Sequence, residues 1–165
     1  MRPTRMVGLT ALVAALATGC GGSSGATAHA SAPPVTQKQA VAVMDRLMAA
    51  APGESAHAFC ANAYQTKTCE DTWKQAAEFC LKPGAAPHII DSAVVENTDT
   101  MDGGRVLKVE GKTASGQRYV SQVFVTAATG TPQASVGVYW SGLGLGDSPF
   151  GENKTVVPQS ECGRK

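Results

Sequence analysis

The residues with the most clearly defined chemistry in this 165-residue chain are four of its five cysteines: Cys60, Cys69, Cys80 and Cys162. Thiolates can hold a metal ion, with His57 as a further ligand, but the spacings Cys-x8-Cys and Cys-x10-Cys lack the close pairs typical of zinc sites. An even number of cysteines is typical of disulfides in an exported chain, because the extracytoplasmic compartment is oxidising. We therefore expect two disulfide bonds, no metal and no other cofactor.

The N-terminus has the layout of an export signal. Arg2 and Arg5 provide a positive segment, and residues 7–17 form an apolar run of 11 residues. The small pair Thr18-Gly19 follows, as at a cleavage site. A membrane-spanning helix needs about 20 apolar residues, so this run is too short to be a permanent anchor. We expect residues 1–19 to be a signal peptide that is removed.

The stretch Leu16-Ala17-Thr18-Gly19-Cys20 resembles the lipobox of bacterial lipoproteins. It departs from the common pattern at Ala17, where the family most often has leucine. The resemblance implies that Cys20 becomes the first residue of the mature chain and carries at least a diacylglyceryl group, with palmitate as an acyl chain. Two or more acyl chains anchor a protein stably, so the expected location is the extracytoplasmic face of the cell membrane. The alternative is plain secretion with a chance cysteine at position 20.

Beyond the signal, the sequence suits one tethered domain. Residues 21–34 contain no apolar residue larger than alanine or proline, so we expect a flexible tether in which His29 is exposed to solvent. Removal of residues 1–19 leaves 146 of the 165 residues, a length that suits one domain. We therefore expect residues 20–35 to be the lipidated cysteine and its tether, and residues 36–165 to be a single domain.

Charge disfavours one class of partner. Loss of Arg2 and Arg5 reduces the 14 basic residues to 12, against 13 acidic residues, for a net charge of −1. Nucleic-acid binding rests on clustered Lys and Arg that neutralise phosphates, and no such cluster stands out in the sequence. The expected partners are the membrane, through the lipid on Cys20, and a small apolar ligand or an envelope protein, with no nucleic acid.

The first half of the domain has the apolar spacing of helices. Thr36 and Gln39 match a capping box and predict a helix start at Thr36. Pro52-Gly53 predicts its end near Ala51. Apolar residues at spacings of three and four predict one buried stripe, formed by Val41, Met44, Leu47 and Met48.

Two more helices are predicted before residue 83. The second covers residues 55–64, and the third follows Thr68, whose hydroxyl is expected to cap it with Asp71 three residues on. Phe79 is predicted to widen the buried face of the third helix. The other members of that face are Cys69, Trp73, Ala76 and Cys80.

These helices restrict the disulfide pairing. Cys69 and Cys80 would lie about 16 Å apart along one helix, whereas a disulfide needs Cα atoms within about 7 Å. Two patterns remain: Cys60–Cys69 with Cys80–Cys162, or Cys60–Cys80 with Cys69–Cys162. A turn near residues 65–67 would make the second and third helices antiparallel, with Cys60 and Cys69 at the same level. We therefore predict the first pattern.

From His88 onward the apolar period is two, which predicts strands. Strands are expected over residues 89–96, 118–126 and 135–141. A further strand is expected around Leu107, where apolar residues alternate with charged ones, and a hairpin turn at Ala114-Ser115-Gly116. The strand over residues 118–126 has apolar residues on both faces and is expected to be central.

The C-terminal part is expected to be a loop and a tied-down tail. The glycine run at residues 142–146 is followed by Asp147-Ser148-Pro149 rather than by a helix, so we expect a loop and not a dinucleotide site. Val156-Val157 is predicted as a short edge strand. A disulfide at Cys162 would hold the end of the chain.

Helices followed by an antiparallel meander form an α+β layout. Over residues 36–141 this order resembles the cone-shaped nuclear-transport-factor-like fold. The resemblance implies N-terminal helices packed on a curved sheet of about four strands. An alanine- and glycine-rich chain with a tether, one compact domain and paired cysteines also resembles small secreted lipoproteins of actinobacterial type.

That fold is shared by enzymes and binding modules, so it does not choose between them. Its enzymes, steroid isomerases and polyketide cyclases, place an aspartate or histidine base in the pocket of the cone, which makes Asp91, His88 and His57 the candidates by resemblance. None of them sits in a catalytic motif, so no catalytic residue is assigned. We expect a non-enzymatic module that binds a small apolar ligand or an envelope protein through the mouth of the cone, and a filled cone would favour a scaffold. The alternative is a small isomerase, cyclase or hydrolase, which a buried acid or histidine in an open apolar pocket would favour.

Overall fold

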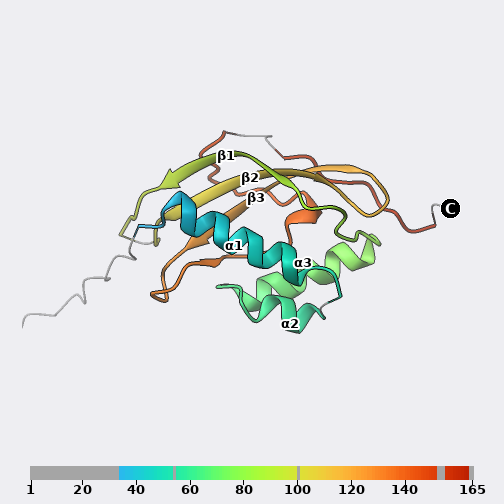
Figure 1. Cartoon of the computed structure of the whole chain (residues 1–165), viewed down its shortest axis with the longest axis horizontal. Coiled ribbons are helices and arrows are strands. Elements are labelled where there is room, and N and C mark those ends of the chain that lie inside the picture. The colour runs from blue at the N-terminus through green and yellow to red at the C-terminus, as the bar shows by residue number, and fades with distance from the viewer. Residues whose placement is uncertain (1–33, 54, 100, 152–154, 164–165) are drawn as a thin grey trace, which may run out of the picture.

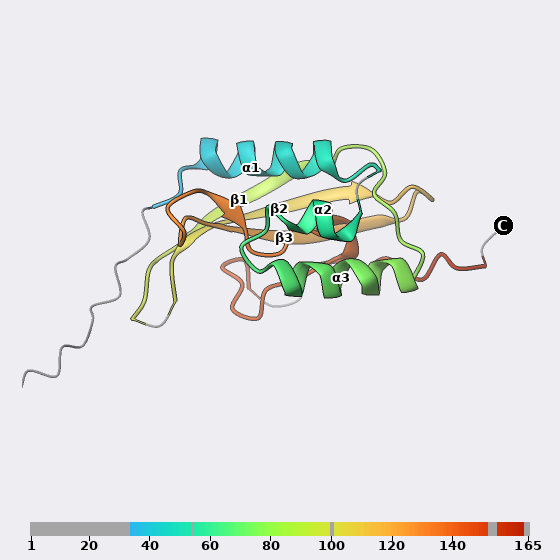
Figure 2. The same ribbon diagram turned by 90° about the horizontal axis from the view of Figure 1, so that it is seen from below.

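The chain folds into helices on one face of an antiparallel sheet, as the change of apolar period predicts. The computed structural model describes residues 34–163 apart from 54, 100 and 152–154. Figure 1 shows the strands arching over the helices, and Figure 2 shows the helices lying across one face of the sheet. The elements in chain order are α1 (Gln37–Ala50), α2 (Ala56–Cys60), α3 (Thr66–Glu78), β1 (His88–Val95), β2 (Gly104–Lys112), β3 (Arg118–Thr126), β4 (Gln133–Ala134) and the 3-10 helix η1 (Tyr139–Ser141).

Helix α1 begins where the capping box predicts. The Thr36 hydroxyl accepts a hydrogen bond from the Gln39 amide at 3.3 Å, and the Gln39 side chain accepts one from the Thr36 amide at 2.9 Å. Val41, predicted in the buried stripe, is only half-buried at its margin. The buried stripe has the spacing i, i+3, i+4, i+7 and consists of Ala40, Val43, Met44 and Leu47.

Helices α2 and α3 have boundaries that differ from the predicted ones. Helix α2 ends at Cys60 rather than at residue 64, and α3 begins at Thr66 and ends at Glu78. Thr68 therefore lies inside α3, and the residue at the cap position, Gln65, makes no side-chain capping bond. Because α3 ends before Phe79, this side chain leaves the predicted buried face and is 47% exposed.

The sheet sets the chain path between α2 and α3. The amide of Tyr64 donates to the carbonyl of Ala134 at 2.8 Å, and the amide of Gln65 donates to that of Ser135 at 2.9 Å. An amide committed to a distant carbonyl cannot also donate within a helix. The boundary of these helices is thus decided by a contact between segments about 70 residues apart.

The sheet has the strand order β1-β2-β3-β4, with every pair antiparallel. The predicted hairpin turn connects β2 and β3 and places Lys112 directly opposite Arg118. Strand β3 is buried on both faces, as predicted, with Val123 on the helix side and Val120 on the other. Strand β1 contains a bulge at Ile90, where its register against β2 shifts.

The predicted fourth strand over residues 135–141 is wrong. In this part of the chain the strand is limited to Gln133–Ala134, Ser135 donates one further backbone hydrogen bond to Phe124, and the chain then leaves the sheet and forms η1. In a strand, Tyr139 and Trp140 would point to opposite faces, whereas here both are buried in the same core cluster. Gly137 allows this path, because a Cβ there would lie 2.8 Å from Leu47 Cδ2.

The C-terminal segment covers the edge of β3 that the short β4 leaves open. Val156 exchanges two backbone hydrogen bonds with Val120, at 2.9 and 3.1 Å, which places the predicted edge strand as a single bridge. The Gln122 amide donates to the carbonyl of Leu143 in the glycine-rich loop. On the sheet face away from the helices, Lys108 lies 5.8 Å from the ring centre of Phe150. None of the helices in the described part of the chain is long and apolar enough to cross a membrane.

Candidate functional site

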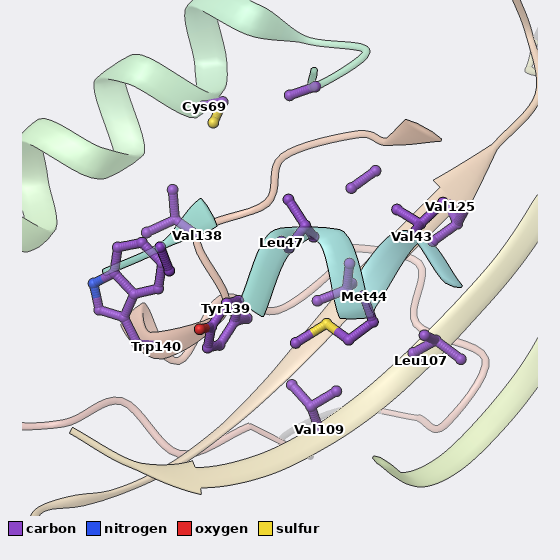
Figure 3. Close-up of a cluster of buried hydrophobic side chains, with 14 of the residues drawn as sticks. Val43, Met44, Leu47, Cys69, Leu107, Val109, Val125, Val138, Tyr139 and Trp140 are labelled. Atoms are coloured by element: carbon purple, nitrogen blue, oxygen red, sulfur yellow. The ribbon is translucent and has the colours of Figure 1, made fainter. Parts of the chain in front are cut away.

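The space between the helices and the sheet is filled by aromatic side chains. Phe59 lies 4.9 Å from Trp73 and 5.5 Å from Trp140, measured between ring centroids. Tyr139 packs edge-on against Trp140 at 5.1 Å, and Tyr119 follows at 6.3 Å from Tyr139. Figure 3 shows residues of α1, β2 and η1 gathered in this core. Packed side chains therefore fill most of the concave face of the sheet, and a pocket of about 300 Å³ remains between α1, α2 and β4, lined in part by Val43, Leu47 and Phe59.

Few polar groups enter this core, and the tyrosines among them are held neutral. Burial raises the pKa of Tyr139 to about 12. Burial, and to a smaller extent Tyr139, also raises the pKa of Tyr119. Tyr119 Oη and Trp140 Nε1 are buried without a hydrogen-bond partner in the described part of the chain. Neither phenol is therefore placed to act as a base near neutral pH.

The three candidate bases of the sequence lie on the surface and are not brought together. His57 on α2 is 86% exposed, and its Nδ1 lies 3.0 Å from Glu70 Oε1. His88 and Asp91 are exposed on β1, in the sheet layer, and Asp91 Oδ1 accepts the amide of Ser92 at 2.8 Å. These residues form no common site and do not enter the core.

The cysteines pair as the hairpin argument predicts. Cys60 is bonded to Cys69 with a Cα separation of 5.6 Å, and Cys80 to Cys162 with a separation of 5.2 Å. Cys20 and His29 lie outside the described residues. Among the residues that are described, no group of three or more His, Cys, Asp and Glu is placed to hold a metal ion.

An open groove lies where the start of β1, the end of β2 and the start of β3 meet. We call it the sheet-corner groove. Its volume is about 520 Å³, within the range of small-molecule sites. It combines small apolar residues with three basic side chains and one acid. The lining residues are Ala85, Ala86, His88, Ile90, Glu110, Gly111, Lys112 and Arg118.

The charges of the sheet-corner groove are unevenly paired. Arg118 Nε donates to Glu110 Oε1 at 2.6 Å. The hydrogen bond from Arg118 lowers the pKa of Glu110, and the charges of Arg118, His88 and Lys108 act in the same direction. Lys112 forms no ion pair within the described residues, although it faces Arg118 across the strands. The groove thus has an excess of positive charge.

A second groove of about 520 Å³ lies between α3 and the C-terminal segment. We call it the helix–tail groove. It has no charged lining residue, and its most exposed apolar residues are Phe79 and Val157, at 47% and 68%. The disulfide between Cys80 and Cys162 joins its two walls. This groove offers contact area but no charge to orient a ligand.

In the sequence, Lys112 is one of the charged residues that alternate with apolar ones in the strand around Leu107, and no motif indicates a role for Lys112 or Arg118. The predicted turn at residues 114–116 is the signal that indicates their proximity, because a hairpin places the residues on either side of its turn opposite each other. The contribution of Ala85, Ala86 and Ile90 depends on how the chain approaches β1 and on the bulge at Ile90. No sequence pattern signals that approach.

The chain matches no protein-family model, and no curated protein or solved structure matches it either.

Proposed function

We propose that this chain is a lipoprotein of the extracytoplasmic membrane face, anchored through Cys20, that binds a ligand without transforming it. Binding is supported by the open sheet-corner groove, and the filled core speaks against a substrate site or a ligand site inside the cone. The space where a cone-shaped enzyme would hold its substrate contains Phe59, Trp73 and Trp140 at centroid distances of 4.9 to 5.5 Å. The proposed binding site is the sheet-corner groove, which is open and has both charged and apolar walls.

The position of this groove suits a tethered binding module. Val35, at the end of the proposed tether, accepts a hydrogen bond from Arg105 Nε at 3.2 Å, next to the start of β2. The sheet-corner groove includes the last residues of the same strand. A strand of nine residues spans about 30 Å. The groove therefore lies at the end of the sheet away from Val35, which is near the start of the described chain.

The proposal includes the nuclear-transport-factor-like cone as the fold type. The order of helices before an antiparallel meander, and the arch of the sheet over α1 and α3 in Figure 1, support this assignment. The short β4 and the C-terminal segment on β3 are departures from a simple cone. The sheet-corner groove lies on the outside of the arch, because Glu110 and Arg118 alternate with the core residues Val109 and Tyr119.

Two measurements test the proposal. Fractionation of cells that express the chain with and without Cys20→Ser should find the parent protein in the membrane fraction and the variant in the medium. Native mass spectrometry of the purified protein, before and after incubation with a small-molecule extract of the cell envelope, should show an added mass. Membrane association that does not depend on Cys20 would contradict the anchor, and an unliganded spectrum in both samples would contradict binding.

A further inference from the structure

We infer that the sheet-corner groove binds a small organic anion with an aliphatic group, whose carboxylate or phosphate contacts Lys112 and Arg118 and whose aliphatic part lies on Ile90 and the segment Ala85-Ala86. The inference rests on the proposed function, because it names the ligand class of the same groove. Two independent observations support the inference: the arrangement of charges in the groove and its exposed apolar wall.

The charge arrangement is costly for the free protein. Lys112 and Arg118 occupy directly opposite positions on β2 and β3, and like charges in such a pair destabilise a sheet. Glu110 contacts Arg118 through Nε, and its pKa is lowered by that hydrogen bond. An anion between the two cations would convert this repulsion into attraction.

Arg118 is also oriented for such an anion. Its Nε is held by Glu110 at 2.6 Å, which limits the positions that the guanidinium can adopt. No described residue accepts a hydrogen bond from its two Nη atoms, so this side of the guanidinium remains available. A guanidinium binds a carboxylate or phosphate through two parallel hydrogen bonds. The Lys112 ammonium, on the neighbouring strand, supplies the second cation.

The apolar wall indicates that the anion is attached to a hydrocarbon. Ile90 is the bulged residue of β1, and 48% of its surface is exposed. A bulge redirects the side chain of the extra residue, and here it leaves Ile90 in the groove lining. Ala85 and Ala86 are exposed on the segment that leads into β1. An inorganic anion would leave this wall in water, whereas an aliphatic chain would cover it.

The test uses the full-length Cys20→Ser variant, in which acylation is prevented. The variant is titrated with ligand, and backbone amide NMR monitors the titration. The probes are octanoate and octyl phosphate, each below the concentration at which it forms micelles. Two control compounds separate the contributions. Acetate has the charge without the octyl chain, and 1-octanol has the octyl chain without the charge. We expect saturable shifts at residues 85, 86, 88–90, 110–112 and 118 with both octyl anions, and at least tenfold weaker binding of acetate and octanol. The ratio of the two octyl affinities separates a carboxylate ligand from a phosphate ligand.

Variants assign the contacts. Lys112→Gln and Arg118→Gln should each weaken octanoate binding about tenfold, the effect of one charged hydrogen bond. Lys74→Gln, on the exposed side of α3, removes the same charge outside the groove and should leave binding unchanged. Ile90→Ser should weaken octanoate and leave acetate unaffected. Arg118→Gln also removes the hydrogen-bond partner of Glu110. If that variant unfolds the protein, the binding measurement on Lys112→Gln decides the test.

The inference is wrong if octanoate and octyl phosphate fail to saturate, if their shifts map outside the groove, or if Lys112→Gln binds as tightly as Lys74→Gln. Such a failure is distinct from failure of the proposed function. A different added mass in native spectra, with anchoring that depends on Cys20, would retain the binding module and reject only the anionic ligand class.

Discussion

At the scale of single residues, glycine positions on β2 decide which side chains can pack. Gly111 lies directly opposite Tyr119 on β3. The Tyr119 ring is fully buried and covers the backbone of Gly111, so that a Cβ there would lie 2.5 Å from Tyr119 Oη and 2.7 Å from Cζ. A glycine weakens a strand by itself, but here it provides the space for a large aromatic ring.

Gly111→Ala should therefore destabilise the fold by about 1–3 kcal/mol, the usual cost of overpacking. Urea unfolding measures this difference. Gly146→Ala is the matched control, because no atom lies within 4 Å of its added Cβ. The control should change the free energy of unfolding by less than about 0.5 kcal/mol. Equal losses in the two variants would mean that Tyr119 does not occupy the space above Gly111.

Burial of Tyr139 makes stability depend on pH in the alkaline range. Its pKa is raised to about 12 in the folded chain, from about 10 when unfolded. The folded state thus retains a proton that the unfolded state loses. This contribution is complete below about pH 10 and is lost as the pH rises towards about 12.

Unfolding midpoints in urea should fall above about pH 10, and the fall should be smaller in Tyr139→Phe. Tyr64→Phe removes a phenol that is 42% exposed and should leave the pH dependence unchanged. Tyrosinate absorbance recorded in the same samples reports ionisation directly. If Tyr139→Phe has the same pH dependence as the parent protein, burial of this phenol is not the cause.

At the scale of elements, local capping and long-range pairing set different helix boundaries. Helix α1 begins at a capping box that the sequence alone predicts. Helix α3 begins where Tyr64 and Gln65 donate to Ala134 and Ser135, and not at Thr68. At its other end, Cys80 has a φ of 57°, in the left-handed region that glycine usually occupies. Its bond to Cys162 explains why a cysteine takes that place.

Two threonine variants separate these cases. Thr36→Ala should lower the free energy of unfolding by about 1 kcal/mol, because it removes a cap. Thr68→Ala should cost much less, because Thr68 lies inside α3 and alanine favours helix. Urea unfolding of both variants gives the comparison. A loss at Thr68 as large as that at Thr36 would place the start of α3 at the predicted cap and contradict the structure.

At the scale of the whole molecule, the C-terminal segment ties the helix layer to the sheet. Val156 forms backbone hydrogen bonds with Val120 of β3. The Glu161 amide donates a hydrogen bond of 2.9 Å to the carbonyl of Phe79, which follows the last residue of α3. The disulfide Cys80–Cys162, with a sequence separation of 82, secures this connection. Cys80 and Cys162 are exposed, whereas Cys60 and Cys69 have no exposed surface.

Graded reduction followed by alkylation should therefore modify Cys80 and Cys162 first, because a thiolate must reach the sulfur that it attacks. Cys60 and Cys69 provide the internal control and should react only when the protein unfolds. Loss of the longer link should lower the free energy of unfolding by about 4 kcal/mol in the chain-entropy model. Mass spectrometry of the alkylated peptides decides the order, and simultaneous modification of all four cysteines would contradict it.

Features that depend on neighbouring residues could be predicted from the amino-acid sequence alone. These are the capping box of α1, the hairpin turn between β2 and β3, the change of apolar period and the pairing of Cys60 with Cys69 across a short turn. Each depends on chemistry within about a dozen residues, so a single segment contains the information.

The remaining features follow from contacts between segments that are far apart in the chain. The end of α2 and the start of α3 follow from bonds of Tyr64 and Gln65 to a segment about 70 residues away. Strand β4 stops at Ala134 because adjacent Tyr139 and Trp140 both enter one core, which a strand would forbid. The sheet-corner groove needs three strands and the segment before β1 to meet. Packing between distant segments sets these features, and no local pattern in the sequence encodes it.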